Sequence, residues 1–257
     1  MTALLSAPPN VDGKTVRAFI ENSGVRPDEG DERPKIGRMK LIADGGFEGG
    51  NMRDPYMEPF GKDGTFRGLQ LIAPARFTEG VKELNRLGWR VGTHAVGDAV
   101  IDEVLEGYEA ANAEKPIKDR RWALEHGFLP REEHFARLNA LGAFVTVQDH
   151  LYLAGPSLVR YWGPVRAAGV TPVRAYLDHG VKVAAGTDAP VEPFPPLWTM
   201  YHFITRDTIS GGVLGPDQKI TRRGPAHQHH RKRTPDIRGK DQGIHRAWQA
   251  GRLRRPG

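Results

Sequence analysis

The stretch that decides the fold is Val91-Gly92-Thr93-His94-Ala95-Val96-Gly97-Asp98, an apolar run that ends in a histidine, a glycine and an aspartate. A buried parallel strand has this pattern when its carboxyl end carries chemistry and a helix follows. Apolar residues have helical spacing before it, over residues 77–87, and after it, over residues 99–111. We therefore predict a helix–strand–helix unit in which Asp98 caps the second helix. His94 ends the strand, a position where a lone histidine is more often a packed core residue than a metal ligand.

The same alternation continues along the chain. Further strands are predicted over residues 1–7, 36–43, 121–127, 143–147 and 181–190, and further helices over residues 14–22, 132–141, 170–179 and 196–206. Strands that alternate with helices, without hairpin signals, predict an α/β fold with a parallel sheet, either a barrel or a doubly wound sheet. The first strand is not followed by a glycine-rich phosphate loop, which disfavours a nucleotide-binding sheet.

Polar residues recur where the predicted strands end, and they favour the barrel. They are Lys40, His94, His126, His150 and Asp188. A barrel gathers its strand ends around one mouth, whereas an open sheet does not. Histidines and an aspartate at the ends of separate strands predict a divalent metal site. The sequence has no cysteine, so any metal would use imidazole, carboxylate or modified side chains.

Composition limits the remaining alternatives. The 257 residues are 39% hydrophobic and 26% charged, which suits a folded domain with a substantial core. The sequence contains neither a run long enough to span a membrane nor a basic leader, so the cytoplasm is the expected location. The net charge of +6 is concentrated after Arg222. We therefore predict a barrel domain over residues 1–221 and a separate basic tail over residues 222–257.

Five motifs in register resemble the amidohydrolase 3 family of the metal-dependent amidohydrolase superfamily. They are Lys40 with Asp44-Gly45, Thr93-His94-Ala95-Val96-Gly97-Asp98, Leu124-Glu125-His126, Val147-Gln148-Asp149-His150 and Gly186-Thr187-Asp188-Ala189-Pro190. The resemblance implies a (β/α)8 TIM barrel with a small β-sandwich built from both chain ends. On this mapping the chain carries about strands 3 to 8 of the barrel and lacks the sandwich.

The resemblance also implies site residues. Lys40, His94, His126 and Asp188 fall on the fourth, fifth, sixth and eighth barrel strands, where the superfamily carries its metal ligands. One or two zinc ions are implied, with a carboxylated Lys40 as a possible bridge. A carbamate would turn a costly buried cation into an anionic ligand.

Two departures from the family pattern lead us to expect a fragment. The His-x-His pair of the first strand is absent, because no histidine precedes His94. Residues 243–255 can be encoded by DNA that, read one nucleotide later, gives GSIEPGKLADFVV, which resembles the family's C-terminal segment. We therefore interpret residues 222–257 as a frameshifted, irregular tail. A genuine basic tail that binds nucleic acid is the disfavoured alternative.

The expected activity is metal-dependent hydrolysis of carbon–nitrogen bonds in a small amide-type substrate, impaired in this chain. Asp188 is expected to bind metal and act as general base, and His150 to contact the substrate carbonyl. Glu125 either orients His126 or is a satisfied core carboxylate. Asp44 belongs either to a turn or to the site. A non-catalytic remnant and a homo-oligomer both remain open.

Overall fold

The structure is a computed structural model that describes residues 2–31, 35–57 and 64–221. Its main sheet consists of β1 (Thr2–Ser6), β2 (Lys35–Ile42), β3 (Val91–Ala95), β4 (Ala123–His126), β5 (Phe144–Gln148) and β6 (Lys182–Gly186). All neighbours pair in parallel, in the order β1-β2-β3-β4-β5-β6. A doubly wound sheet would reverse its order at a switch point. The unbroken order is that of a barrel, and it confirms the predicted partial (β/α)8 barrel.

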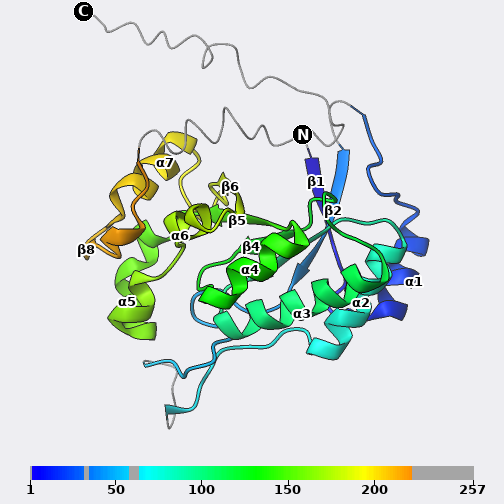
Figure 1. Cartoon of the computed structure of the whole chain (residues 1–257), viewed down its shortest axis with the longest axis horizontal. Helices are drawn as coiled ribbons and strands as arrows, with labels where there is room; N and C mark the ends of the chain where they lie inside the picture. The colour runs from blue at the N-terminus through cyan, green and yellow to red at the C-terminus, as the bar shows by residue number, and fades with distance from the viewer. Residues whose placement is uncertain (1, 32–34, 58–63, 222–257) are drawn as a thin grey trace, which may run out of the picture. The chain divides into compact units, whose positions relative to one another are not determined.

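Helices alternate with the strands along the chain. They are α1 (Gly13–Ser23), α2 (Pro74–Arg86), α3 (Asp98–Glu114), α4 (Glu132–Leu141), α5 (Leu151–Ala168), α6 (Val173–Asp178) and α7 (Pro196–Thr205), with the short 3-10 helix η2 (Pro216–Gln218). Figure 1 shows α1, α2, α3 and α4 in a row along the sheet. None of the helices in the described part of the chain is long and apolar enough to cross a membrane.

The alternation of side chains in β2 shows how the sheet separates a core from a site. Met39 and Leu41 are buried in the core that the sheet shares with the helices. Arg38 and Lys40 alternate with them and therefore lie on the opposite face, which would be the interior of a barrel. This explains the lysine among apolar neighbours: only every second residue of the strand enters the apolar layer.

The N-terminus of α3 differs from the sequence prediction. Gly97 is the N-cap residue, and Asp98 makes no capping hydrogen bond. The backbone carbonyl of Asn51 instead accepts from the N–H groups of Ala99 and Val100, at 3.2 and 3.3 Å. Asn51 belongs to the long loop between β2 and α2. A Cβ on Gly97 would lie 1.8 Å from the Asn51 carbonyl oxygen, so this loop can approach the helix only at a glycine. Asp98 accepts from the N–H of Arg53 instead, at 2.9 Å.

Three further features were not predicted. α5 occupies a stretch that the sequence left without an element, and β7 (Asp207–Thr208) pairs with β8 (Gly212–Val213) in a small antiparallel hairpin. The loop between β2 and α2 supplies a second apolar cluster, in which Met52 and Tyr56 pack with Phe128 and Trp162. Within the described residues the only sheets are the six-stranded one and this hairpin, so no β-sandwich is present there. The predictions for residues 222–257 lie outside the described residues.

Candidate metal centre

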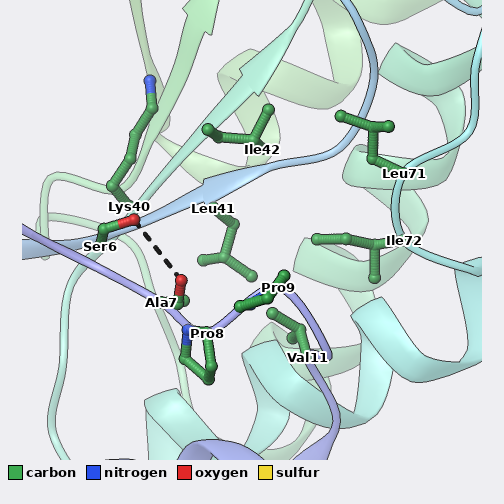
Figure 2. Close-up of a pocket in the computed structure, with 10 residues that line it drawn as sticks. All are labelled: Ser6, Ala7, Pro8, Pro9, Val11, Lys40, Leu41, Ile42, Leu71 and Ile72. Carbon is green, nitrogen blue, oxygen red and sulfur yellow. Dashed lines mark hydrogen bonds between the residues drawn. The ribbon is translucent and has the colours of Figure 1, made fainter.

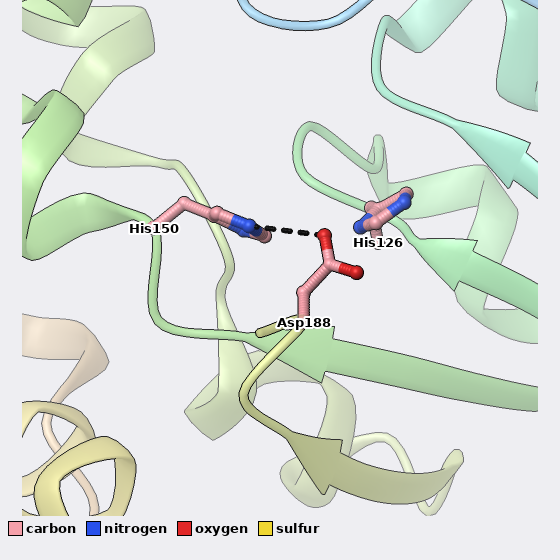
Figure 3. Close-up of side chains that lie close together, drawn as sticks. All are labelled: His126, His150 and Asp188. Carbon is pink, nitrogen blue, oxygen red and sulfur yellow. Dashed lines mark ion pairs between the residues drawn. The ribbon is translucent and has the colours of Figure 1, made fainter. Parts of the chain in front are cut away.

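Side chains from three consecutive strand ends form a compact group of metal-ligating atoms. His126 ends β4, His150 follows β5, and Asp188 follows β6. One ligand atom of each residue lies within 4.8 Å of the other two. Figure 3 shows the Asp188 carboxylate between the two imidazoles, with its ion-pair contact to His150 Nε2 at 3.3 Å. The group thus offers two nitrogen ligands and one oxygen ligand.

His94 and Lys40, also predicted as ligands, lie beside this group but are not part of it. The rings of His94 and His126 are edge to face, with centroids 4.5 Å apart. His94 Nε2 lies 3.1 Å from the carbonyl oxygen of Gly45, to which it donates a hydrogen bond. The ammonium group of Lys40 forms an ion pair with Glu125. A free ammonium paired with a carboxylate is not the carbamate that the resemblance implies, so a carboxylated Lys40 stays a prediction.

Of the two alternatives predicted for Glu125, the structure places it as a paired carboxylate and not against His126. Glu125 pairs with Lys40, and it is Gln148 whose amide oxygen lies 2.7 Å from His126 Nδ1. Because the amide oxygen can only accept, Nδ1 carries the proton and the Nε2 lone pair is left for a ligand. Sequence reasoning missed Gln148, although it immediately precedes Asp149-His150 at the end of a predicted strand.

The electrostatics of the group suit a divalent cation. Burial lowers the pKa of His126 to about 3, and burial likewise lowers the pKa of His94, so both imidazoles are neutral near pH 7. The hydrogen bond from His150 holds the pKa of Asp188 below its usual value, and this carboxylate is therefore ionised. Neutral imidazole and ionised carboxylate are the forms that bind zinc.

The backbone at two of these residues is unusual. His126 has φ of 72° and Asp188 has φ of 55°, both in the left-handed region that disfavours residues with a Cβ. Strand alternation would place His126 on the same face as Leu124, which is buried in the apolar core. The left-handed turn at His126 ends the strand and brings its ring beside His94 and His150 instead.

Asp44 stabilises the turn that follows β3, and its Oδ1 lies 3.6 Å from His94 Nε2, so a role in the site stays a prediction beside the observed turn. Its fully buried carboxylate accepts from the N–H groups of Asn51, Val96 and Gly97 at 2.9 to 3.0 Å. It thereby ties the long loop to the turn that follows β3. Burial raises the pKa of Asp44 to about 7, against the effect of these hydrogen bonds.

Aromatic rings fix the position of His150. Phe47 from the long loop and Phe128 stack on each other, with centroids 5.1 Å apart. Both meet the His150 ring edge to face, at 5.5 and 5.3 Å. The imidazole is only 3% exposed, and its buried Nδ1 has no hydrogen-bond partner among the described residues. These contacts leave His150 Nε2 directed at Asp188.

Two other features near the sheet do not belong to this centre. Asp102, Glu133 and His134 also lie close together, but Arg53 and Arg137 form ion pairs with Asp102, and these cations oppose a metal ion. A pocket of about 370 Å³ lies beside the ends of β1 and β2 (Figure 2). Its lining is Ser6, Ala7, Pro8, Pro9, Val11, Lys40, Leu41, Ile42, Leu71 and Ile72. It is mostly apolar and shares only Lys40 with the predicted site.

The fold is that of solved hydrolases. The chain is similar to an uncharacterized metal-dependent hydrolase from Pyrococcus furiosus, with a TM-score of 0.69 and 22% identity, covering 90% of this chain and 46% of that one. A second, from Pyrococcus horikoshii OT3, gives a TM-score of 0.67 and 24% identity, covering 82% of this chain and 42% of that one.

The chain belongs to the amidohydrolase family, whose model matches residues 5–227. It is also similar to the N-substituted formamide deformylase of Arthrobacter pascens, at 30% identity over 146 residues. That match covers 53% of this chain and 26% of the deformylase. The chain thus spans about a quarter of this curated relative and less than half of the similar structures.

Proposed function

We propose that this amidohydrolase uses a divalent cation to hydrolyse carbon–nitrogen bonds of small amide-type substrates. The observation that carries the proposal is the convergence of His126, His150 and Asp188 at the carboxyl ends of parallel strands, where barrel enzymes carry their active sites. Support comes from the family membership and from the similarity to a protein named N-substituted formamide deformylase. Zinc is the proposed cation, because imidazole and carboxylate ligands at such a site suit it.

The residues divide the chemical work. A divalent cation, when bound, would lower the pKa of a water molecule and polarise the substrate carbonyl. Asp188, whose side chain is 42% exposed, is placed to accept a proton from the attacking water and to pass it to the leaving nitrogen. Gln148 holds the His126 ring in one tautomer. The resemblance makes Lys40, His94, His126 and Asp188 the ligands of the cation and places His150 against the substrate.

Turnover is proposed to be weak. The resemblance implies up to two ions, whereas the described residues gather one compact ligand group at the strand ends. The other group, Asp102, Glu133 and His134, is paired with Arg53 and Arg137, whose positive charges oppose a second cation. A cytoplasmic location and a homo-oligomer also stay proposals.

The test is amine release from a panel of N-formyl and N-acetyl amines by the zinc-loaded protein. Asp188→Asn keeps the size of the side chain but cannot accept the proton, so we expect the rate to fall at least about 100-fold. Asp178→Asn is the control, because Asp178 is exposed and forms an ion pair with Arg174, away from the ligand group. Unchanged turnover in Asp188→Asn would contradict its role as base. Failure of the zinc-loaded protein to release amine from any substrate would contradict the reaction class.

A further inference from the structure

We propose that the pocket beside the ends of β1 and β2 holds an apolar ring or branched alkyl group of the substrate, so that amides carrying such a group are preferred. The proposal rests on the proposed hydrolysis of amides, and it concerns the part of the substrate that does not react. The pocket has a volume of about 370 Å³. Small-molecule sites measure about 300–1,000 Å³, so this volume suits one small group and not a peptide segment.

The pocket exists because β1 ends while β2 continues. Ala7 donates a backbone hydrogen bond to the Lys40 carbonyl at 2.9 Å, just beyond the end of β1. Pro8-Pro9 follows, and proline has no N–H with which to extend the ladder. The chain therefore leaves the sheet and opens a hollow beside the end of β2. Figure 2 shows this hollow between residues 41–42 and residues 71–72.

The inner wall of the pocket is apolar. Val11, Leu41 and Ile72 line it and belong to the buried core. Lys40 is the one charged residue of the lining, and its ammonium forms an ion pair with Glu125. Figure 2 shows the Lys40 side chain extending away from Val11 and Ile72. A charged substituent would lose its water in this pocket without gaining a partner, so the pocket favours a neutral one.

The outer wall leaves apolar surface uncovered. Ile42 and Leu71 also line the pocket, and they are 46% and 51% exposed. Protein interiors leave few voids larger than a water molecule, so a hollow of this size with an apolar mouth is not ordinary packing. An apolar group in the pocket would remove both side chains from water, which stabilises the complex.

The pocket adjoins the candidate metal centre. Ile42 pairs with His94 across β2 and β3, and Lys40 pairs with Gly92. Both Ile42 and Lys40 line the pocket, while His94 and Lys40 are ligands according to the resemblance. The pocket also lies at the carboxyl ends of its strands, where barrel enzymes bind substrates. An amide group at the centre and its apolar substituent in the pocket would thus occupy neighbouring strands.

Binding of amides to the full chain, followed by ligand-observed NMR, tests the proposal without turnover. N-cyclohexylformamide and cyclohexanecarboxamide place a ring on either side of the amide, and N-methylformamide and acetamide are their small counterparts. We expect each ring amide to bind at least about tenfold more tightly than its counterpart, because the ring is removed from water. The same ring carrying a carboxylate should bind within about threefold of the small amides.

Leu71→Trp fills the pocket from its exposed side. We expect this variant to bind the ring amides at least about tenfold more weakly and the small amides within about threefold of the wild type. Leu69→Trp is the matched control, because Leu69 lies two residues earlier, is 49% exposed and does not line the pocket. It should keep the affinity of the wild type for every amide.

Nuclear Overhauser effects in the wild-type protein provide a measurement that does not depend on the folding of a variant. We expect contacts from the ring protons of the bound amide to the methyl groups of Val11 and Ile72, and none to those of Leu69. Ring amides that bind no more tightly than small ones, or that contact other methyl groups, would overturn the proposal and leave hydrolysis of small amides intact.

Two further outcomes separate the remaining explanations. Shifts of the Val11 and Ile72 methyl signals on raising the protein concentration alone would identify another copy of the chain as the occupant, and would overturn the proposal. Contacts of the ring amides in the pocket, without release of amine from any amide, would contradict the proposed reaction and not the binding site.

Discussion

At the scale of single residues, the site depends on space left by a glycine. Lys40, Gly92 and Glu125 come from three neighbouring strands, and Lys40 is directly paired with Gly92 in the sheet. A Cβ on Gly92 would lie 2.5 Å from Glu125 Oε1. Glycine therefore makes room for the carboxylate that neutralises Lys40, next to a centre proposed to bind a cation.

Gly92→Ala should displace Glu125, weaken its ion pair with Lys40 and lower the free energy of unfolding by about 1–3 kcal/mol, the usual cost of overpacking. Urea unfolding measures the change. Gly186→Ala is the control, because Gly186 is also a strand glycine but a Cβ there would meet no atom within 4 Å. Equal stability of the two variants would show that the space at Gly92 is not limiting.

Asp44→Ala should destabilise the protein by about 3 kcal/mol or more, because it removes the acceptor of three backbone N–H groups, each costing about 1–3 kcal/mol when left buried and unpaired. Asp44→Asn keeps one acceptor oxygen and should lose less. Urea unfolding would rank the variants. If Asp44→Asn and Asp44→Ala lower the free energy of unfolding equally, the turn is held by packing and not by these hydrogen bonds.

At the scale of elements, helix termini hold the long loop and the helices together. The Asn51 carbonyl caps α3, while at the start of α4 the His134 side chain receives the N–H of Arg131 at its Nδ1, 2.9 Å away. His134 Nε2 donates to Asp102 at 2.9 Å. The neutral imidazole therefore satisfies both of its nitrogens, and protonation at Nδ1 would break the cap.

The stability that His134 provides should depend on pH. Burial lowers its pKa in the folded state, so the unfolded chain binds the extra proton first as the pH falls below about 6.5. The stability advantage of the wild type over His134→Gln should shrink between pH 7.5 and 5.5 in urea unfolding.

His179 is the control for this prediction, because its pKa is raised, first by a hydrogen bond to the Ala175 carbonyl. Its contribution is present below about pH 6.5 and lost as the pH rises. The advantage of the wild type over His179→Gln should therefore grow as the pH falls. The same trend in both variants would contradict the protonation states assigned here.

Elements also show which parts of the fold could be predicted from sequence. The strand–helix repeats were predictable because their apolar spacing is local. α5 was not, because Pro156, Pro164 and a kink at Gly163, with φ of 80°, interrupt the helical pattern. Tertiary packing of Leu158 and Trp162 keeps this segment helical. Asp98 failed as a cap because a loop distant in sequence occupies that position.

The types of residue that form the site could be predicted from the sequence, but the directions in which their side chains point could not. Histidines and an aspartate at strand ends indicated where chemistry would gather. The partner of each side chain depended on backbone turns that no spacing rule specifies, such as the left-handed φ of His126. For that reason Gln148, rather than Glu125, holds His126, and His150 joins the compact group.

At the scale of the whole molecule, the described chain leaves apolar surface uncovered after β6. Phe194, Leu197, Trp198 and Tyr201 have helical spacing on and before α7, and they are 80%, 61%, 37% and 53% exposed. Each of the outer strands β1 and β6 also has one partner in the described sheet. Exposed apolar patches of this kind favour association.

We therefore expect the chain to self-associate with rising concentration, and the double variant Phe194→Glu, Leu197→Glu to shift it toward the monomer. Size exclusion with light scattering measures the mass. Val165→Glu is the control, because Val165 is an 85% exposed apolar residue on α5. An unchanged mass in the double variant, or an equal shift in the control, would show that the α7 surface is not the contact.

The left-handed backbone at His126 and Asp188 sets thermal stability against the side chains that these positions carry. Glycine adopts such a conformation without penalty, so Asp188→Gly should melt at a higher temperature than Asp188→Ala, by the equivalent of about 1 kcal/mol, although both remove the carboxylate. Thermal unfolding of the metal-free variants would show it, and the reverse order would mean that these residues are relaxed. Under selection for heat resistance alone, replacement of Asp188 by glycine would be favoured, and the carboxylate that we propose as the general base would be lost.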